Sequence, residues 1–374
     1  MKIVISKKQL MESIKICNSI VDNTSFTPIF LGIFIEVLDN HVRFTTTNGT
    51  ISVNSVVYKN EECDILEQGV VLIKSKSFFS IISKLKNENI TLEKVDNSVL
   101  KIKTSTFDLN TNIMDDAQYP SINFSCLNWN EINLPASIFK KVSNKIKQSV
   151  NNNKEKSSIF SGVCFLSNKE KETLEIVGTD TFKLSYYCFN YKHEDFKFVL
   201  DINLIELFLE LLDFNSNVKI YLSENNVIIK INNITISAKV LEGEYPNIYP
   251  IINSPKINKY IISKKEFIDA LERGIVVSSS EKKPIAKINF SNSTMKLSFK
   301  SIDLGNSEEE VTCTAVNKED HITISFNASF MISLLKTFDN DILNIYTSSE
   351  NKPIILEDEK EPSYIQLLVP IKSY

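Results

Sequence analysis

The chain has 374 residues, of which 43% are hydrophobic and 24% charged, and its formal net charge is −4. These proportions are typical of folded globular proteins and exclude a disordered chain. No run of about 18 uncharged apolar residues occurs, and charged residues interrupt the start of the chain at Lys7, Lys8, Glu12 and Lys15. The sequence therefore predicts neither a membrane span nor a signal peptide, and we expect a cytoplasmic protein.

The first predicted helix begins after Ser6. Residues Ser6–Gln9 form a capping-box pattern, in which the fourth side chain reaches back to the backbone of the first residue. Apolar residues then follow at the spacing of one helix face: Leu10, Met11, Ile14 and Cys17. A second capping box at Ser263–Glu266 precedes an equivalent face, formed by Phe267, Ile268, Leu271 and Ile275. A third helix of this kind is expected after Leu134, with Pro135 in its first turn and an apolar face of Ile138, Phe139, Val142 and Ile146.

Alternating apolar and polar residues predict antiparallel strands around a second helix. In the first third of the chain these strands are Ile33–Val37, Val42–Thr46, Ile51–Val57, Ile90–Glu93, Val99–Lys103 and Phe107–Asn112. The last three have counterparts at Val218–Leu222, Val227–Ile231 and Thr235–Val240. Two helices packed on antiparallel sheet make an α+β domain.

This pattern repeats at a constant spacing. Helix N-cap residues stand at Ser75, Asp201 and Asn327, and both intervals are 126 residues (201 − 75 and 327 − 201). The motif Ala117–Pro120 returns as Gly243–Pro246, also 126 residues later (243 − 117). Such a period is too long for a solenoid unit of roughly 20–50 residues and fits a small domain. We therefore predict three tandem copies of one two-helix, antiparallel-sheet domain, at residues 1–124, 125–252 and 253–374.

No catalytic or metal-binding constellation is evident. The six cysteines form no C-x-x-C pair and share no position in the repeat, and the three histidines are scattered. An enzyme that uses Thr179-Asp180 or a cluster of carboxylates is the weaker alternative, because no motif assembles a base, an oriented nucleophile and an anion hole. We expect a protein without catalysis, cofactor or metal.

Lysines gather on the predicted helices although the whole chain is acidic. They lie off the apolar faces, at Lys7, Lys8, Lys15, Lys76, Lys141, Lys145, Lys264 and Lys265. A basic helix surface on an acidic protein favours a phosphate-bearing partner. The alternative is that these are ordinary solvated helix faces, since Glu12 and Asp269 lie among them.

Several segments, in order along the chain, carry a resemblance to a known family: Thr27–Ile29, Gly178–Asp180 with Lys183-Leu184, Lys239–Pro246 and Leu367–Ile371. Together with the threefold repeat, they resemble the bacterial DNA polymerase III beta subunit, the sliding clamp, over the whole chain. The resemblance implies a DNA clamp fold and a head-to-tail homodimer that closes into a ring around double-stranded DNA. It also implies partners that carry clamp-binding motifs, namely the replicative DNA polymerase, the clamp loader and other proteins.

The resemblance also implies three sets of site residues. Loops after the first helices would touch DNA through Lys154, Lys156, Lys282 and Lys283. The dimer interface would join Phe107 and Leu109 to Val276 and Val277 of the second chain. A hydrophobic pocket for partner peptides would comprise Phe160, Thr179, Thr181, Phe182, Lys183, Leu184, Pro246, Pro250, Ile251, Pro353, Leu367, Leu368, Val369, Pro370 and Ile371.

Two departures and two alternatives accompany this interpretation. Thr24 stands where the family often has arginine, and Thr181-Phe182-Lys183 replaces the common Gly-His-Arg, so peptide preference is open. Leu367–Val369 is otherwise simply the last core strand, with Pro246 ending a linker. A monomeric three-domain interaction scaffold is the alternative to the ring, because a repeat alone does not require ring closure.

Overall fold

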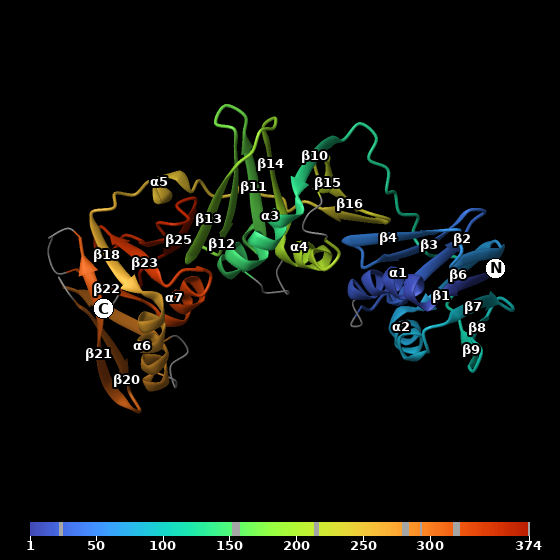
Figure 1. Cartoon of the computed structure of the whole chain (residues 1–374), viewed down its shortest axis with the longest axis horizontal. Coiled ribbons are helices and arrows are strands. Elements are labelled where there is room, and N and C mark those ends of the chain that lie inside the picture. The colour runs from blue at the N-terminus through green and yellow to red at the C-terminus, as the bar shows by residue number, and fades with distance from the viewer. Residues whose placement is uncertain are drawn as a thin grey trace. The chain divides into compact units, whose positions relative to one another are not determined.

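The computed structural model describes residues 1–21, 25–151, 158–212, 217–278, 284–291, 294–316 and 322–372 (Figure 1). Its contacts divide the chain into two units, each of which combines separate segments. The first unit contains Met1–Phe139 and Asn203–Val240, and the second contains Lys140–Ile202 and Leu241–Tyr374. The predicted middle domain contributes to both units. Some of its strands join a sheet with strands of the first copy, and others join a sheet with strands of the last copy.

The first unit holds two antiparallel sheets. A five-stranded sheet has the order β5-β1-β7-β8-β9, and an eight-stranded sheet has the order β10-β15-β16-β17-β4-β3-β2-β6. Helix α1 packs against α2 and against β4. The elements are β1 (Lys2–Ser6), α1 (Lys7–Ser19), η1 (Pro28–Leu31), β2 (Gly32–Val37), β3 (His41–Thr47), β4 (Ile51–Tyr58), β5 (Cys63–Glu67), β6 (Gly69–Lys74), α2 (Ser75–Lys84), β7 (Asn89–Lys94), β8 (Val99–Lys103), β9 (Asp108–Asn112), β10 (Asn130–Pro135), β15 (Asn217–Leu222), β16 (Asn226–Ile231) and β17 (Ile234–Lys239).

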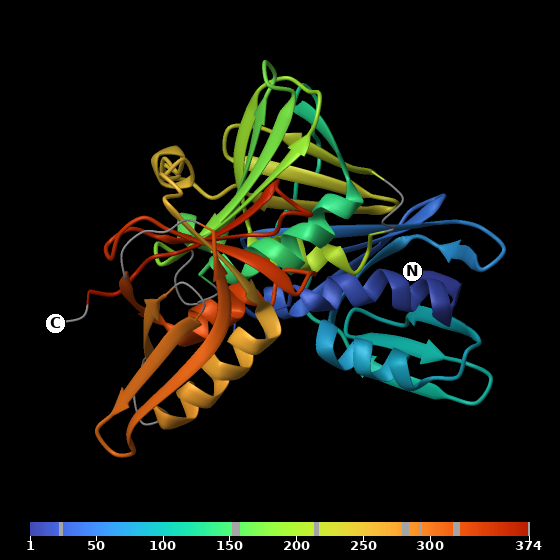
Figure 2. The same ribbon diagram turned by 60° about the vertical axis from the view of Figure 1, so that its left-hand side comes forward.

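Helices α3 (Ala136–Lys141) and α4 (Ile202–Leu209) have residues in both units. The second unit is built on one sheet with the order β14-β11-β12-β13-β25-β24-β23-β18-β21-β20-β19-β22. Its elements are η2 (Val142–Ile146), η3 (Lys147–Ser149), η4 (Ile159–Ser161), β11 (Gly162–Asn168), β12 (Thr173–Thr179), β13 (Lys183–Asn190), β14 (Phe196–Asp201), α5 (Tyr249–Ile252), β18 (Asn258–Ser263), α6 (Lys264–Val277), β19 (Ile285–Phe290), β20 (Thr294–Ser301), β21 (Gly305–Ala315), β22 (Thr323–Asn327), α7 (Ala328–Leu335), β23 (Ile342–Thr347), β24 (Ile354–Glu357) and β25 (Tyr364–Leu368). Helix α6 packs against α7, β20 and β21. Figure 2 shows α6, in orange, lying along these two strands.

Several predicted helix caps are confirmed. The Ser6 hydroxyl accepts a hydrogen bond from the Gln9 backbone N–H at 3.3 Å, and Ser263 does the same for Glu266 at 3.3 Å. Asn327 Oδ1 accepts from the Phe330 N–H at 3.1 Å. These side chains satisfy backbone donors that the first helical turn leaves without partners.

Two predictions about helix starts are wrong. Gln9 does not reach back to Ser6, because the Ser6 N–H already donates to the Glu62 carbonyl at 2.7 Å and the Gln9 amide donates to Asn60. Ser75 is not a cap but the first residue of α2, and its buried hydroxyl donates to Asn18 Oδ1 at 2.9 Å. In both places a partner distant in sequence replaces the local hydrogen bond.

The middle copy's first helix departs from regular geometry. Pro135 ends strand β10, so the helix begins one residue later than expected, at Ala136. Helix α3 then widens into a π-helix at η2 and tightens into a 3-10 turn at η3. A π turn contains an extra residue, which changes the face on which the following side chains lie. Both Lys145 and Ile146 are buried at this point.

Glycine is required where α6 meets the sheet. A Cβ atom added at Gly274 would lie 2.0 Å from Cε2 of Phe299, and the Phe299 side chain is 1% exposed. A buried aromatic ring has little space into which to move. The close approach of α6 to β20 therefore depends on the missing side chain.

We predict that Gly274→Ala lowers the free energy of unfolding by about 1–3 kcal/mol, because the clash outweighs the gain of roughly 1 kcal/mol in helix propensity. Urea denaturation followed by circular dichroism measures the change. The double variant Gly274→Ala/Phe299→Leu should recover part of the loss by removing ring atoms. Equal or greater stability of Gly274→Ala alone would contradict the steric explanation.

Candidate functional site

The candidate site is built on the pairing of β13 with β25. The two strands are antiparallel, with Leu184 opposite Leu367 and Ser185 opposite Gln366. Side chains alternate between the two faces of a strand. This seam between the middle and last copies of the repeat therefore presents one apolar face and one polar face.

On the apolar face the seam contributes to a buried hydrophobic cluster. Leu184, Ile365 and Leu367 pack there with other buried side chains: Cys164, Val177, Val199, Tyr245, Ile248, Ile252 and Ile355. The Tyr245 hydroxyl donates to the Val177 carbonyl at 3.1 Å. Within two residues of cluster members in sequence, large apolar side chains reach solvent, with exposed fractions of 56% for Phe182, 39% for Tyr249, 38% for Ile251 and 40% for Val369. We call these exposed residues and the cluster beneath them the docking face.

The predicted pocket residues fall into three groups by exposure. The buried group contains Thr179, Lys183, Leu184, Leu367 and Leu368. The half-buried group contains Phe160, Pro353, Pro370 and Ile371. The exposed group contains Thr181, Phe182, Pro246, Pro250, Ile251 and Val369. The alternation of β25 places Leu368 on the opposite face from Leu367, outside the cluster. Sequence reasoning missed Ile365, which the same alternation identifies, and also Tyr245, Ile248 and Ile252.

A tight turn directs Phe182 outward. Asp180 Oδ1 accepts hydrogen bonds from the backbone N–H groups of Phe182 and Lys183 at 2.9 and 2.7 Å. The Thr179 hydroxyl donates to the Lys183 carbonyl at 2.7 Å, and Thr181 has a φ of 76°. Thr179 and Asp180, on which the enzyme alternative would rest, are thus engaged in shaping this turn.

Lys183 does not present its charge to solvent. Its side chain is 10% exposed, and its ammonium donates to the Gln148 carbonyl and lies 3.4 Å from Asp180 Oδ2. The same Nζ is 4.7 Å from the centre of the Phe330 ring, a cation–π distance. Lys183 therefore supports the turn from inside and does not present its charge to a partner.

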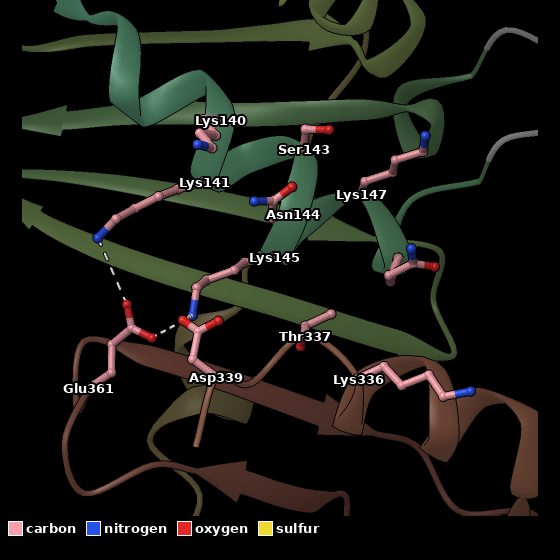
Figure 3. Close-up of a pocket in the computed structure, with 11 residues that line it drawn as sticks. Lys140, Lys141, Ser143, Asn144, Lys145, Lys147, Lys336, Thr337, Asp339 and Glu361 are labelled. Carbon is pink, nitrogen blue, oxygen red and sulfur yellow. Dashed lines mark hydrogen bonds and ion pairs between the residues drawn. The ribbon is translucent and has the colours of Figure 1, made fainter. Parts of the chain in front are cut away.

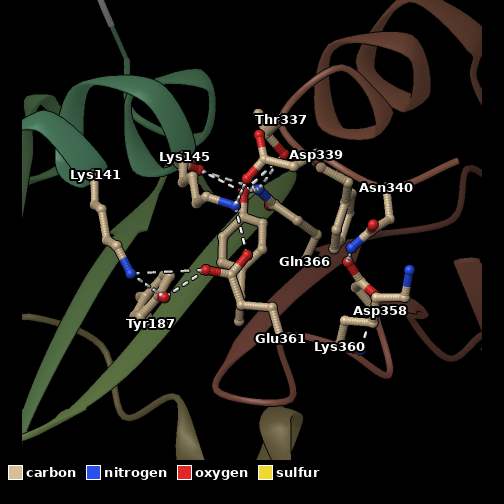
Figure 4. A network of polar contacts seen from close by, with 12 residues as sticks. Lys141, Lys145, Tyr187, Thr337, Asp339, Asn340, Asp358, Lys360, Glu361 and Gln366 are labelled. Carbon is tan, nitrogen blue, oxygen red and sulfur yellow. Dashed lines mark hydrogen bonds and ion pairs between the residues drawn. The ribbon is translucent and has the colours of Figure 1, made fainter.

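The polar face carries a network centred on Lys145 (Figure 4). Lys145 Nζ lies 2.5 Å from Glu361 Oε2 and 3.1 Å from Asp339 Oδ2, and the Lys145 side chain is 7% exposed. The Tyr187 hydroxyl donates to the other oxygen of Glu361 and accepts from Lys141 Nζ at 2.6 Å. Residues from η2, β13 and the segment before β25 are thus joined through one carboxylate.

The backbone of Lys145 extends the same network. Its carbonyl accepts hydrogen bonds from the Tyr364 hydroxyl at 2.8 Å and from Gln366 Nε2 at 3.1 Å. Gln366 Oε1 in turn accepts from the Ser185 hydroxyl at 2.7 Å. All these polar groups are buried, where an unpaired group would cost about 1–3 kcal/mol.

The environment fixes the protonation of these groups. Burial by itself would lower the pKa of Lys145, but its hydrogen bonds to Glu361 and Asp339 outweigh that effect and raise the pKa above its usual value. Burial, followed by the hydrogen bond to Glu361, raises the pKa of Tyr187 to about 12. At neutral pH Lys145 is therefore charged and Tyr187 keeps its proton.

A polar cavity of about 720 Å³ adjoins this network (Figure 3). It is lined by Lys140, Lys141, Ser143, Asn144, Lys145, Lys147, Gln148, Lys336, Thr337, Asp339 and Glu361. Asp339 is 85% exposed, whereas Glu361 is 22% exposed, so solvent reaches one side of the network more easily than the other.

The predicted DNA-facing lysines divide into exposed and internally bonded groups. Lys8, Lys15, Lys76 and Lys265 are exposed, and Lys15 pairs with Glu210 at 2.7 Å. Lys7 donates to the carbonyls of Ser83 and Leu85, and Lys264 donates to the Phe338 carbonyl at 2.7 Å. Lys141 and Lys145 belong to the network on the polar face. Lys154, Lys156, Lys282, Lys283 and Thr24 lie outside the described residues.

This division corrects the prediction for three lysines. Lys7 and Lys264 occupy the same position in two copies of the repeat, and each binds carbonyls at or just beyond the end of the copy's second helix. Lys145 is buried and neutralised by carboxylates. Their ammonium groups are committed to the fold, so we do not propose them as DNA contacts.

Two of the predicted dimer residues lie at the margin of a sheet and two at the end of a helix. Strand β9 is the last strand of the five-stranded sheet, Phe107 just before it is 36% exposed, and Leu109 is half-buried. Val276 and Val277 end helix α6, where Val276 is 66% exposed. Within the described ranges, no group of three or more histidine, cysteine, aspartate or glutamate side chains is placed to hold a metal ion. None of the helices described there is long and apolar enough to cross a membrane.

Three copies of a two-helix domain, linked by sheets that continue from one copy into the next, define a three-domain clamp. Comparison with known families agrees with this class. Residues 1–123, 133–247 and 251–372 match, respectively, the N-terminal, central and C-terminal domains of the DNA polymerase III beta subunit. The chain therefore belongs to the DNA polymerase III beta subunit family.

Relatives extend over the full length of the chain. It is 28% identical to the "Beta sliding clamp" of Mycoplasma pneumoniae over 387 residues, which covers 100% of both proteins. It is 24% identical to that of Bacillus subtilis, again over 100% of both. The crystal structure of the Bacillus subtilis DNA polymerase sliding clamp matches with a TM-score of 0.90 at 22% identity, covering 100% of each chain. A DNA polymerase III beta chain from Streptococcus pneumoniae gives 0.91 at 20%, with the same coverage.

Proposed function

We propose that this protein is a non-catalytic processivity factor that closes into a ring around double-stranded DNA and tethers DNA-processing proteins. Family membership supports this proposal. One structural observation also supports it: two junctions between copies are made by the same kind of strand pair, and the strands that would make a third such junction are left without a partner in the described part of the chain. The domain boundaries after residues 124 and 252, and a cytoplasmic location, stay predictions.

The copies of the repeat are joined by the same kind of strand pair. In the first junction β4 pairs with β17, and in the second β13 pairs with β25. The sheet orders β17-β4-β3-β2-β6 and β25-β13-β12-β11-β14 have the same arrangement. The last copy has the matching order β21-β20-β19-β22, but Gly305–Thr312 of β21 has only β20 beside it among the described strands. Strand β9, which corresponds to β17 and β25 as the last strand of its copy, likewise pairs only with β8 in the part of the chain that the structure describes.

An open β9 in the first copy of the repeat and an open β21 in the last copy predict head-to-tail association. If β9 of one chain pairs with β21 of another, the third junction repeats the two within the chain. A heterologous contact of this kind generates closed rings when its rotation closes. Pairing also removes edge strands, which otherwise invite aggregation. We infer a homodimer, as the family implies.

Side chains near the two edges suit this contact. Phe107 and Leu109 provide apolar area at β9, and α6 packs on β21, so that Val276 and Val277 lie on an element beside the open strand. The charges near the two edges are largely balanced within the chain, because Lys101 pairs with Asp108 of β9, and Glu308 and Glu309 of β21 pair with Lys296 and Arg273. The apolar side chains, rather than charge, therefore support the contact.

Leu109→Asp should convert the dimer into folded monomers, because the carboxylate would be buried without a partner at the interface. Analytical ultracentrifugation at micromolar concentration measures the mass. Leu127→Asp is the matched control, since Leu127 is 82% exposed and lies outside the predicted interface. A monomeric wild-type protein would instead favour the three-domain scaffold.

DNA binding of this kind depends on encirclement more than on affinity. The exposed lysines Lys8, Lys76 and Lys265 come from different helices, and the chain as a whole carries a net charge of −4. A few contacts to phosphates, without base readout, are sequence-independent and weaken with salt. A ring with this surface would be retained by topology and remain free to slide.

Protein loaded by an ATP-driven clamp loader should remain on nicked circular duplex DNA and leave once the circle is cut. A gel-filtration assay that separates DNA-bound from free protein follows both states in moderate salt. The uncut circle, incubated in parallel, controls for spontaneous release. Equal retention on circular and linear DNA would exclude encirclement.

The docking face fits a short partner peptide with apolar anchors. Leu184 and Leu367 lie beneath it, and Phe182, Ile251 and Val369 provide exposed apolar area around them. Each buried apolar anchor contributes roughly 1.5–3 kcal/mol. We propose that it binds motifs with a glutamine, a leucine and a final hydrophobic or aromatic pair.

Val369→Asp should weaken binding of such a peptide at least about tenfold, equivalent to about 1.4 kcal/mol, because the new carboxylate loses water on binding. Isothermal titration calorimetry measures the affinity, and Leu184→Asp tests the buried part of the same face. Val316→Asp serves as control because Val316 is also exposed, at 53%, and is outside the docking face. Unchanged affinity in Val369→Asp and Leu184→Asp would place partner binding elsewhere.

A further inference from the structure

The strand that carries part of the docking face is anchored from behind by the polar network. On β25, Ile365 and Leu367 belong to the apolar cluster, whereas Tyr364 and Gln366 bind the carbonyl of Lys145 on the other face. Val369 directly follows the strand, and its N–H donates to the Phe182 carbonyl at 2.9 Å. The two faces are thus separated by the thickness of one strand.

The network fixes β25 at its beginning and at its middle. Glu361 stands three residues before Tyr364, at the beginning of β25, and binds both Lys145 and Tyr187. Gln366, in the centre of the strand, is held by Lys145 and Ser185. Segments η2 and η3 pack on β13, and α7 packs on β25, so the groups that hold the strand come from both copies of the repeat.

Ion pairs that are nearly buried respond strongly to the loss of one partner. Removing one charge leaves the other desolvated and unpaired, which costs more than the pair itself contributes. Glu361 is the only carboxylate of the described network that touches both Lys145 and Tyr187. Loss of its charge would therefore loosen the start of β25 without removing any atom of the docking face.

We propose that Lys145, Tyr187 and Glu361 are positioning residues for partner binding, which hold β25 so that Leu367 and Val369 present the docking face in its binding conformation. This inference rests on the proposed function of that face. None of the three side chains is part of the docking face itself. Their effect on a partner is transmitted through the β13–β25 seam.

The test uses the full-length protein and a fluorescent peptide of the clamp-binding type. Glu361→Gln keeps the shape of the side chain and removes its charge, and Tyr187→Phe removes only a hydroxyl. Both should weaken the peptide about three- to tenfold, within the range of couplings carried by residues that contact neither ligand. Hydrogen exchange should accelerate at the backbone amides of 364–369 and remain unchanged in β3 of the first unit.

Two controls separate positioning from general damage. Glu194→Gln breaks the exposed pair of Glu194 with Lys169, 2.8 Å apart in the same unit, and should change neither affinity nor exchange. Lys145→Met combined with Glu361→Gln should bind more tightly than Lys145→Met alone, because the double variant leaves less unpaired charge behind. A purely structural role would show the same rescue in the free energy of unfolding but would leave peptide affinity within twofold of the wild type in all of these variants.

Outcomes for this inference and for the proposed function are distinguishable. If Val369→Asp abolishes binding while Glu361→Gln and Tyr187→Phe stay within twofold of the wild type, the positioning role is overturned and the docking face stands. If the wild type binds no peptide, the proposed docking function fails, and exchange at residues 364–369 still decides whether the network holds β25. If Glu361→Gln unfolds the protein, the peptide affinity and the hydrogen exchange of Tyr187→Phe decide whether the network positions β25.

Discussion

The whole structure depends on the pairing of strands between copies of the repeat. An exposed strand edge leaves backbone donors and acceptors without protein partners, and proteins cover or pair such edges. Here β17 covers the edge of β4, and β25 covers the edge of β13. The next copy therefore covers an edge of the one before it, and the pairing of β25 with β13 brings Ile365 and Leu367 into one apolar cluster with Leu184.

Because of the same pairing, strand β25 contacts an apolar cluster on one face and a polar network on the other. Because side chains alternate, Leu367 packs into an apolar cluster while Gln366 takes part in a polar network. A slip of one residue in register would exchange these environments and bury polar groups among apolar ones. The polar network thus favours a single register, which a uniformly apolar strand would specify less strongly.

Sequence patterns predicted the local elements well and the long-range contacts poorly. Strand Val99–Lys103 and the helix caps Ser6, Ser263 and Asn327 follow from residue type and spacing, because each depends on neighbours in sequence. The burial of Lys145 does not, since it depends on a π turn and on carboxylates more than 190 residues away. Similarly, Leu184 and Leu367 could be predicted for the candidate site, whereas the inward position of Lys183 depends on the Gln148 carbonyl and the Phe330 ring.

Lysine count alone overstates the charge available to a phosphate backbone. Lys7 and Lys264 bind carbonyls near the ends of second helices in two copies, and Lys145 is enclosed by carboxylates. Of the predicted DNA-facing lysines that the structure describes, Lys8, Lys15, Lys76 and Lys265 remain exposed, on helices α1, α2 and α6 of a chain whose net charge is −4. Strong, localised phosphate contacts would slow movement along DNA, because each must break before the protein can advance. A sparse set of weak contacts lowers that barrier, and retention then has to come from the closed shape rather than from affinity.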